Sequence, residues 1–221
     1  MNLIIAGPQA SGKGVQADFL KEKLGLVHFS IGQALRKLAK QKSSLGKQVD
    51  YIINTKGLLV PEKITTGVVR KALSERNLSR GIVFDGYPRT QEQVGILDQL
   101  LKEKNTSINR AFFLVVGQEE IKKRLLGRVV CVSCGANYNI YTQPPLENGK
   151  CDKCQSVLEK RSDESAEAIN NRYTIYQQET VPVINLYRQK GILEEVDGNP
   201  PPEVVFETIF QRLKKAGLVG E

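Results

Sequence analysis

The chain alternates short apolar runs with longer segments in which apolar residues recur every three or four positions. Short apolar runs bounded by glycine or polar residues are typical of strands buried in a parallel sheet, and the longer pattern is typical of helices with one buried face. The expected strands are residues 3–6, 25–30, 81–85, 111–116 and 192–196, and the expected helices include residues 15–24, 62–75, 121–126 and 203–215. This alternation predicts an α/β fold.

The first apolar run leads into a glycine-rich loop and then into a helix. The loop, Gly7 to Gly14, has the spacing Gly-x-x-x-x-Gly-Lys. Its glycines let successive backbone N–H groups turn toward one anion, and the helix adds the positive end of its dipole. Lys13 supplies a mobile charge for the β- and γ-phosphates. The alternative is a glycine turn that only joins a strand to a helix.

No hydroxyl follows Lys13, although a Ser or Thr there usually holds magnesium; Gly14 and Val15 follow instead. We therefore expect Mg²⁺ to be held by phosphates, water and another side chain. Asp85 ends an apolar strand at the sheet edge where ligands bind, so it is expected to hold the water shell of the ion. The alternative, a helix cap, is weaker because Thr90 and Gln91 already supply a helix start.

His28 and Arg36 are two further candidates for a functional role in this half of the chain. His28, the only histidine, lies in an expected strand without a partner histidine, which favours a packed core residue over a ligand or base. Residues 33–60 contain two groups of apolar residues at helical spacing, and Gly57 ends the second group. This segment therefore predicts a small helical lobe. Arg36 lies on its first helix and can face the phosphate loop, or be a solvated surface arginine.

All four cysteines fall between residues 131 and 154, as Cys131-x-x-Cys134 and Cys151-x-x-Cys154. Two such knuckles separated by 16 residues form a strong zinc signature. Four thiolates leave no open coordination position, so a structural ion is expected, with residues 137–149 as a hairpin-like insert that can cover the phosphates. Disulfides are the alternative, disfavoured by the absence of an export signal.

The chain has 221 residues and a net charge of +8. This length predicts one main domain with room for small insertions. No apolar run approaches the roughly 18 residues of a membrane span and the start lacks a signal-peptide pattern, so a cytoplasmic protein is expected. The positive charge suits nucleic acid and small phosphorylated substrates equally.

Three local patterns together resemble the adenylate kinases, in the long bacterial form with a zinc-bearing lid. They are the Gly7 to Gly14 loop, the segment Asp85-Gly86-Tyr87-Pro88-Arg89, and the insert from Arg128 to Arg161 with its cysteines. The similarity runs from Met1 to the last helix. It implies a P-loop core of five parallel strands with helices on both faces (residues 1–29, 61–127 and 162–221), a nucleoside monophosphate-binding lobe (30–60) and a zinc-binding lid (128–161).

The resemblance implies an enzyme that catalyses ATP + AMP = 2 ADP with Mg²⁺, a lid that closes over ATP, and a structural Zn²⁺. It implies catalytic roles for Lys13, Asp85, Arg89, Arg124, Arg128, Arg161 and Arg172. The implied ATP contacts are Gly7, Ala10, Ser11, Gly12, Lys13, Gly14, Val15, Arg128, Asn137, Tyr138 and Pro200. The implied AMP contacts are Ile31, Arg36, Leu58, Leu59, Val60, Gly86, Tyr87, Pro88, Arg89, Gln93, Arg161 and Arg172. The implied partners are these nucleotides, without nucleic acid or membrane, and the implied state is a monomer.

Four residues depart from the pattern of that family, and one of them is Glu164, which stands where the second acid of the lid is usually an Asp. Val15 and Ile31 stand where a Thr is usual, and Gln33 stands where an Asp is usual. Ile31 removes a hydroxyl near the AMP site and Gln33 removes a carboxylate from the surroundings of the magnesium ion. Asp163 is expected to pair with a lid arginine when the lid shuts.

Three other functions stay open at this point. A kinase of the same build can phosphorylate another nucleoside monophosphate, although Gln93 and the zinc lid favour AMP. A zinc-ribbon protein can bind nucleic acid, but Tyr138 and Tyr141 are the only candidate stacking residues of the insert. A regulatory ATP switch without transfer chemistry is the third possibility.

Overall fold

A five-stranded parallel sheet forms the centre of the protein. The structure, a computed structural model, describes residues 1–75, 77–161 and 166–220. The sheet order is β2-β3-β1-β4-β8, and each neighbouring pair runs parallel. The predicted α/β fold and its five parallel strands are confirmed. The strands are β1 (Asn2–Ala6), β2 (Val27–Ser30), β3 (Ile82–Asp85), β4 (Arg110–Val115) and β8 (Leu193–Asp197).

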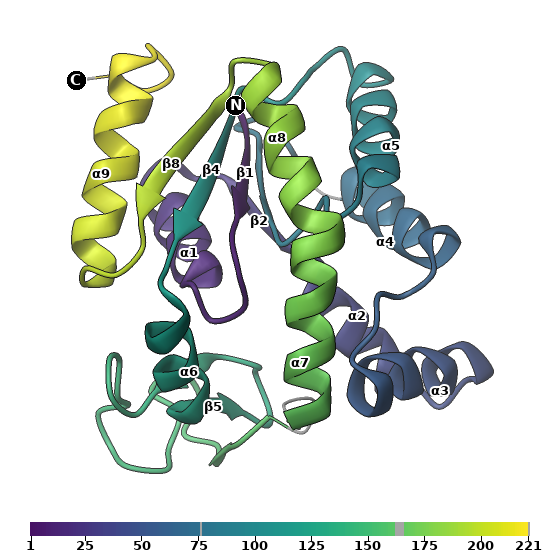
Figure 1. Cartoon of the computed structure of the whole chain (residues 1–221), viewed down its shortest axis with the longest axis vertical. Coiled ribbons are helices and arrows are strands. Elements are labelled where there is room, and N and C mark those ends of the chain that lie inside the picture. The colour runs from purple at the N-terminus through teal and green to yellow at the C-terminus, as the bar shows by residue number, and fades with distance from the viewer. Residues whose placement is uncertain (76, 162–165, 221) are drawn as a thin grey trace.

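Helices cover both faces of this sheet because alternate strand residues bury apolar side chains on opposite sides. In β1, Leu3 and Ile5 pack toward one cluster and Ile4 toward the other. The first cluster lies under α1 (Lys13–Leu24) and α9 (Pro202–Lys215), which Figure 1 shows on one side of the sheet. The second lies under α4 (Glu62–Glu75), α5 (Gln91–Lys102) and α8 (Val181–Gln189).

Short helices occupy the segment for which the sequence predicts a helical lobe. They are α2 (Ile31–Ala39), α3 (Ser44–Asp50) and the π-helical turn η1 (Tyr51–Lys56). Gly57 ends η1 with a φ of 63°, a left-handed conformation that glycine adopts without strain. Val49 and Ile53 pack into the same core cluster as α4, which attaches these short helices to the rest of the protein.

A second, three-stranded antiparallel sheet follows α6 (Gln118–Leu126). Its order is β6-β5-β7, formed by β5 (Arg128–Cys131), β6 (Asn137–Asn139) and β7 (Leu158–Glu159). The sequence predicts a hairpin-like insert here. The structure adds a third strand because β7 returns to pair with β5 at Cys131 and Leu158.

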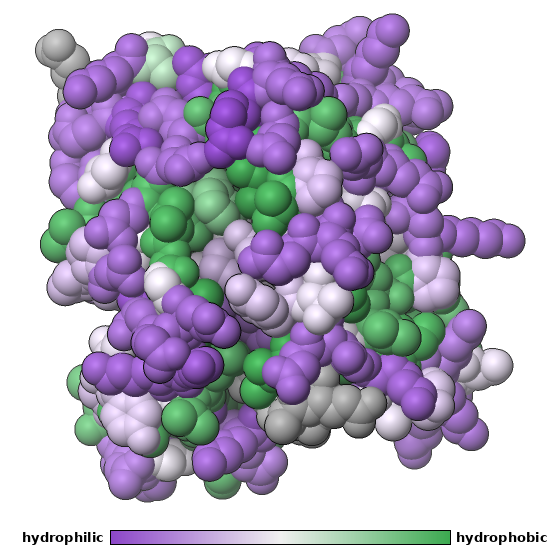
Figure 2. Space-filling view, in the orientation of Figure 1, coloured by the Kyte–Doolittle hydropathy of each residue, from purple (hydrophilic) through white to green (hydrophobic). Residues whose placement is uncertain are grey.

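One long helical rod passes from this second sheet back to the core (Figure 1). It consists of α7 (Ala166–Ile175), the π-helical turn η2 (Tyr176–Thr180) and α8. Pro182 explains the irregular turn, because proline lacks an N–H and its ring clashes with the carbonyl four residues earlier. No helix in the described part of the chain is long and apolar enough to cross a membrane. Hydrophilic residues cover most of the face in Figure 2.

Candidate active site

A cavity of about 1090 Å³ opens at the carboxyl ends of the central strands, where an open α/β sheet binds its ligands. Its walls come from the glycine-rich loop, the short helices α2 and η1, the three-stranded sheet and the rod. Every residue that the resemblance assigns to catalysis or to either nucleotide lines this one cavity. Of the four cysteines, Cys134 lines it.

The glycine-rich loop has the conformation of an anion cradle. Gly7 and Gly12 have φ angles of 145° and 96°, which side chains rarely adopt. A Cβ at Gly7 would also lie 2.8 Å from the Ser11 hydroxyl oxygen. Gly12 is the N-cap of α1, so the loop presents the N-terminus of that helix to the cavity.

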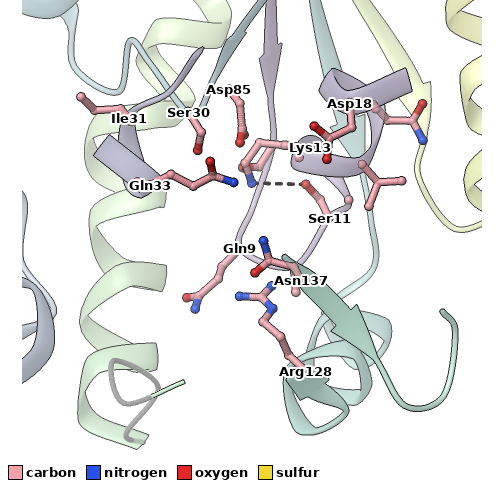
Figure 3. A pocket seen from close by; sticks show the side chains of 18 of the residues that line it. Gln9, Ser11, Lys13, Asp18, Ser30, Ile31, Gln33, Asp85, Arg128 and Asn137 are labelled. Atoms are coloured by element: carbon pink, nitrogen blue, oxygen red, sulfur yellow. Dashed lines mark hydrogen bonds between the residues drawn. The ribbon is translucent and has the colours of Figure 1, made fainter. Parts of the chain in front are cut away.

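The Lys13 ammonium group folds back onto this loop. Its Nζ donates to the carbonyl oxygens of Gly7 at 2.9 Å and Pro8 at 2.5 Å. Figure 3 shows a longer contact, 3.4 Å, with the Ser11 hydroxyl. Burial, together with the nearby guanidinium groups of Arg89, Arg128 and Arg161, lowers the pKa of Lys13 to about 8, although Asp85 opposes the shift. Such a cationic neighbourhood is suited to a polyanion.

Asp85 lies at the end of β3, as predicted, and faces the start of α1. A Cβ on Gly14 would lie 3.6 Å from its Oδ2. Burial would raise the pKa of Asp85, but contacts with His28 and the charge of Lys13 outweigh burial and hold it below its usual value. The carboxylate is therefore ionised beside Lys13, where it can bind the waters of a divalent cation. Figure 3 shows Gln33 extending into the same space.

The side chain of His28 is 8% exposed, in keeping with the predicted packed residue, but it also connects two carboxylates, those of Asp18 and Asp85. Its Nδ1 lies 2.9 Å from Asp18 Oδ1, and its Nε2 lies 3.5 Å from Asp85 Oδ2. Burial would lower the pKa of His28, but the two carboxylates raise it to about 9. No local sequence signal relates these residues. The β2–β3 register and the packing of α1 bring them together.

Both the main chain and the side chain of Arg89 form hydrogen bonds within the protein. Its N–H donates to Gln93 Oε1 at 2.7 Å, and its Nε donates to the Gly86 carbonyl at 2.8 Å. Burial and the charges of Arg172 and Arg161 lower the pKa of Arg89. Three guanidinium groups whose charges act on one another in this way could together bind a doubly charged anion.

The remaining predicted arginines surround the same cavity. Arg124 donates to Glu120 Oε1 at 2.7 Å and to the Asn199 carbonyl at 3.2 Å, which fixes it against the loop that contains Pro200. Arg36 packs over Gly32, where a Cβ would lie 3.2 Å from its guanidinium. Figure 3 shows Arg128 and Asn137 on the side opposite Asp85. Asp163 lies outside the described residues.

The four cysteine sulfurs form one cluster. All four lie within 4.8 Å of one another, with Cys131 and Cys154 sulfurs 3.4 Å apart and Cys134 and Cys151 sulfurs 3.5 Å apart. A tetrahedral zinc ion with Zn–S bonds of about 2.3 Å holds its sulfurs about 3.8 Å apart. The cluster therefore fits such an ion.

The backbone repeats the same turn at both knuckles. The Cys131 N–H binds the Ala136 carbonyl and the Cys151 N–H binds the Ser156 carbonyl. Gly135 and Gln155 close the two turns, both with left-handed φ angles. Tyr138 joins this centre to the cavity, because its hydroxyl accepts from the Asp152 N–H at 2.9 Å and lies 3.5 Å from the Cys151 sulfur.

The fold and site define a P-loop phosphotransferase, with an anion cradle, a buried lysine and clustered arginines at one sheet edge. Residues 5–192 match the family model described as adenylate kinase. The chain is 41% identical to an adenylate kinase of Archaeoglobus fulgidus over 97% of this chain and 99% of that protein. It is 37% identical to one of Thermosipho melanesiensis over 97% and 100%, and 38% identical to one of Clostridium botulinum over 95% and 96%. The chain belongs to the adenylate kinase family of nucleoside monophosphate phosphotransferases.

Proposed function

We propose that this protein transfers the γ-phosphoryl group of ATP to AMP, reversibly and with Mg²⁺, to give two ADP. The observation that supports this most directly is the charge arrangement around Lys13. Guanidinium groups of Arg89, Arg128 and Arg161 come near it from the core and from the segment 128–161, so both sides of the cavity supply cations to one point. Two nucleotides whose phosphates meet there would have their repulsion neutralised.

The donor ATP is proposed to lie on the glycine-rich loop, with its base side toward Asn137, Tyr138 and Pro200 and with Arg124 among the arginines around the transferred phosphoryl group. The acceptor AMP is proposed to lie against α2 and η1, with its phosphate on Arg36, Arg89 and Arg172. Because Gln93 Oε1 already accepts from the Arg89 N–H, its Nε2 end is the part that remains for the adenine ring. Leu59 and Val60 supply an apolar wall to the same pocket.

The chemistry needs positioning and charge neutralisation rather than a base of matched pKa. Lys13 stabilises the charge that develops on the transferred group, and the arginines hold donor and acceptor in line. When bound, Mg²⁺ neutralises the donor phosphates. Asp85 would hold water molecules of its coordination shell. The lid, proposed as residues 128–161, would close over ATP and exclude water, which otherwise hydrolyses the donor.

The four cysteines are proposed to hold one structural Zn²⁺ that shapes the lid. Residues 30–60 are proposed as the lobe that binds AMP, and residues 1–29, 61–127 and 162–221 as the core. We further propose a cytoplasmic monomer whose partners are small nucleotides rather than nucleic acid or a membrane. Thiolate metal ligands suit a reducing compartment, and two lobes that move separately suit a monomer.

A coupled assay for ADP formed from ATP, AMP and Mg²⁺ tests the proposal directly. AMP should be the preferred acceptor in a panel with GMP, CMP and UMP. A bisubstrate compound that joins two adenosines through five phosphates should inhibit competitively against both substrates. No ADP formation, or a faster reaction with another monophosphate, would overturn the assignment.

A further inference from the structure

The main chain of Arg89 is held from two different elements. On one side, its N–H donates to the buried side chain of Gln93, at the start of α5. On the other, its carbonyl oxygen accepts from the Thr180 hydroxyl at 3.2 Å. Thr180 is 9% exposed and lies 91 positions along the chain, at the end of η2. This second bond crosses between the core loop and the rod.

The irregular turn η2 explains why the Thr180 hydroxyl bonds to Arg89 and not to a carbonyl of its own helix. A helical threonine commonly donates to the carbonyl four residues earlier. In η2, the Tyr176 carbonyl instead accepts from the Val181 N–H, five residues later. The hydroxyl of Thr180 therefore bonds outside its own helix, just before Pro182.

The same rod also brings Arg172 to Arg89. Arg172 lies on α7, eight positions before Thr180, and its charge lowers the pKa of Arg89. Eight residues of a regular α-helix would rotate about 80° past two full turns. The wider π turn between the two residues reduces that offset. Thr180 thus bonds to the Arg89 carbonyl oxygen, and Arg172 lines the same cavity, close enough for its charge to act on the Arg89 guanidinium.

Arg172 also contacts the helical lobe. Its guanidinium donates to the Ile53 carbonyl at 3.3 Å, and the neighbouring Asn171 side chain donates to the Lys56 carbonyl at 2.9 Å. The rod is thus bonded to the lobe at Arg172 and to the core loop at Thr180. Two guanidinium groups that repel one another will not keep a fixed spacing unless their backbones are fixed.

We propose that Thr180 is a positioning residue for the acceptor phosphate: its hydroxyl ties the rod to the Arg89 loop and so sets the distance between the Arg89 and Arg172 guanidinium groups. This inference rests on the proposed function, in which these two arginines bind the phosphate of AMP. Thr180 itself would contact no phosphate. Its effect should therefore appear in AMP affinity and little in the ATP half of the site.

Thr180→Val tests this because valine keeps the shape of threonine and loses the hydroxyl. We expect the KM for AMP, and its dissociation constant by calorimetry, to rise roughly three- to tenfold, the range for one lost hydrogen bond. The KM for ATP should change less than about twofold. Thr180→Ser keeps the hydroxyl and should restore AMP affinity. Thr208→Val removes an exposed helical hydroxyl on α9 and serves as the matched control.

A double-mutant cycle with Arg172→Ala gives a readout that a purely structural role would not change. If Thr180 acts through the spacing of the two arginines, Thr180→Val should raise the AMP dissociation constant far less in the Arg172→Ala background than in the wild type. Equal effects in both backgrounds would overturn the inference. So would a Thr180→Val protein with a lower melting temperature and unchanged AMP affinity. Failure of the wild type to phosphorylate AMP would instead overturn the proposed function.

Discussion

His28 Nδ1 lies 2.9 Å from Asp18 Oδ1, and this contact turns the other ring nitrogen toward Asp85. An imidazole between two carboxylates is stabilised in its protonated form, because both ring N–H groups then point at negative charge. Asp85 in turn keeps its negative charge beside Lys13. A row of alternating charges thus extends from α1 to the phosphate cradle.

The stability of the protein should fall as pH rises because of His28. Its pKa rises from 6.5 in the unfolded chain to about 9 in the folded protein, so folding favours the protonated ring. This contribution, on the order of 3 kcal/mol, is complete below pH 6.5 and is lost as pH rises through about 9. Urea unfolding at pH 6 to 9.5 measures it as the difference in unfolding free energy between the wild type and His28→Gln.

That difference separates His28 from other titrating groups, since both proteins keep Lys13. Asp18→Asn should reduce the difference by removing one of the two carboxylates that stabilise the ring. Parallel stability curves for the wild type and His28→Gln across this pH range would contradict a protonated His28.

Lys13 should limit activity at alkaline pH. Its pKa of about 8 means that the free enzyme loses the Lys13 charge above pH 8. We expect kcat/KM for ATP to fall above that pH, and kcat to fall less, because bound phosphates stabilise the ammonium group. Lys13→Arg should abolish the alkaline fall up to pH 10, and Lys13→Ala should reduce turnover by about 10²-fold or more. A flat profile in the wild type would argue against this role.

Sequence patterns were sufficient where the signal is local. The phosphate loop, Asp85 at a strand end and the two cysteine knuckles each depend on a few consecutive residues, and the strands follow from apolar runs. The His28–Asp18 pair and the Thr180–Arg89 bond depend instead on how distant elements pack. No periodicity or spacing encodes such a contact, and a lone histidine on a strand gives no hint of its neighbours.

The arginines show the same limit. Residues 128, 161 and 172 carry no motif that separates them from surface arginines, and only the resemblance to a family gathers them into one site. The structure shows that they line one cavity because the three-stranded sheet and the rod meet above the glycine-rich loop. Charge patterning alone would leave Arg70, which pairs with Glu103 on the surface, an equal candidate.

Arg89→Ala should lower turnover by about 10²-fold or more and raise the KM for AMP more than the KM for ATP. Arg89→Lys should recover little, because a single ammonium cannot replace the guanidinium fork that donates to the Gly86 carbonyl and to an anion together. Arg70→Ala is the matched control, since it removes an exposed arginine from a surface ion pair. If Arg89→Ala and Arg70→Ala reduced the steady-state turnover rate by similar amounts, Arg89 would have no specific role in phosphoryl transfer.

If the four-cysteine cluster holds the proposed Zn²⁺, removal of that ion should unfold the proposed lid before the core. The segment 128–161 has little apolar core of its own, since Cys131 and Cys151 are the buried hydrophobic residues described there. If the cluster holds the proposed Zn²⁺, metal–thiolate bonds would supply most of the folding free energy of this segment, whereas the central sheet has two apolar clusters. After chelation, thermal unfolding followed by circular dichroism should show an added early transition, and the later transition should stay near its original midpoint.

Cys134→Ser should reproduce this melt without a chelator, and metal analysis should find about one ion per chain in the wild type. An unchanged melt after complete metal removal would mean that the cluster folds without an ion.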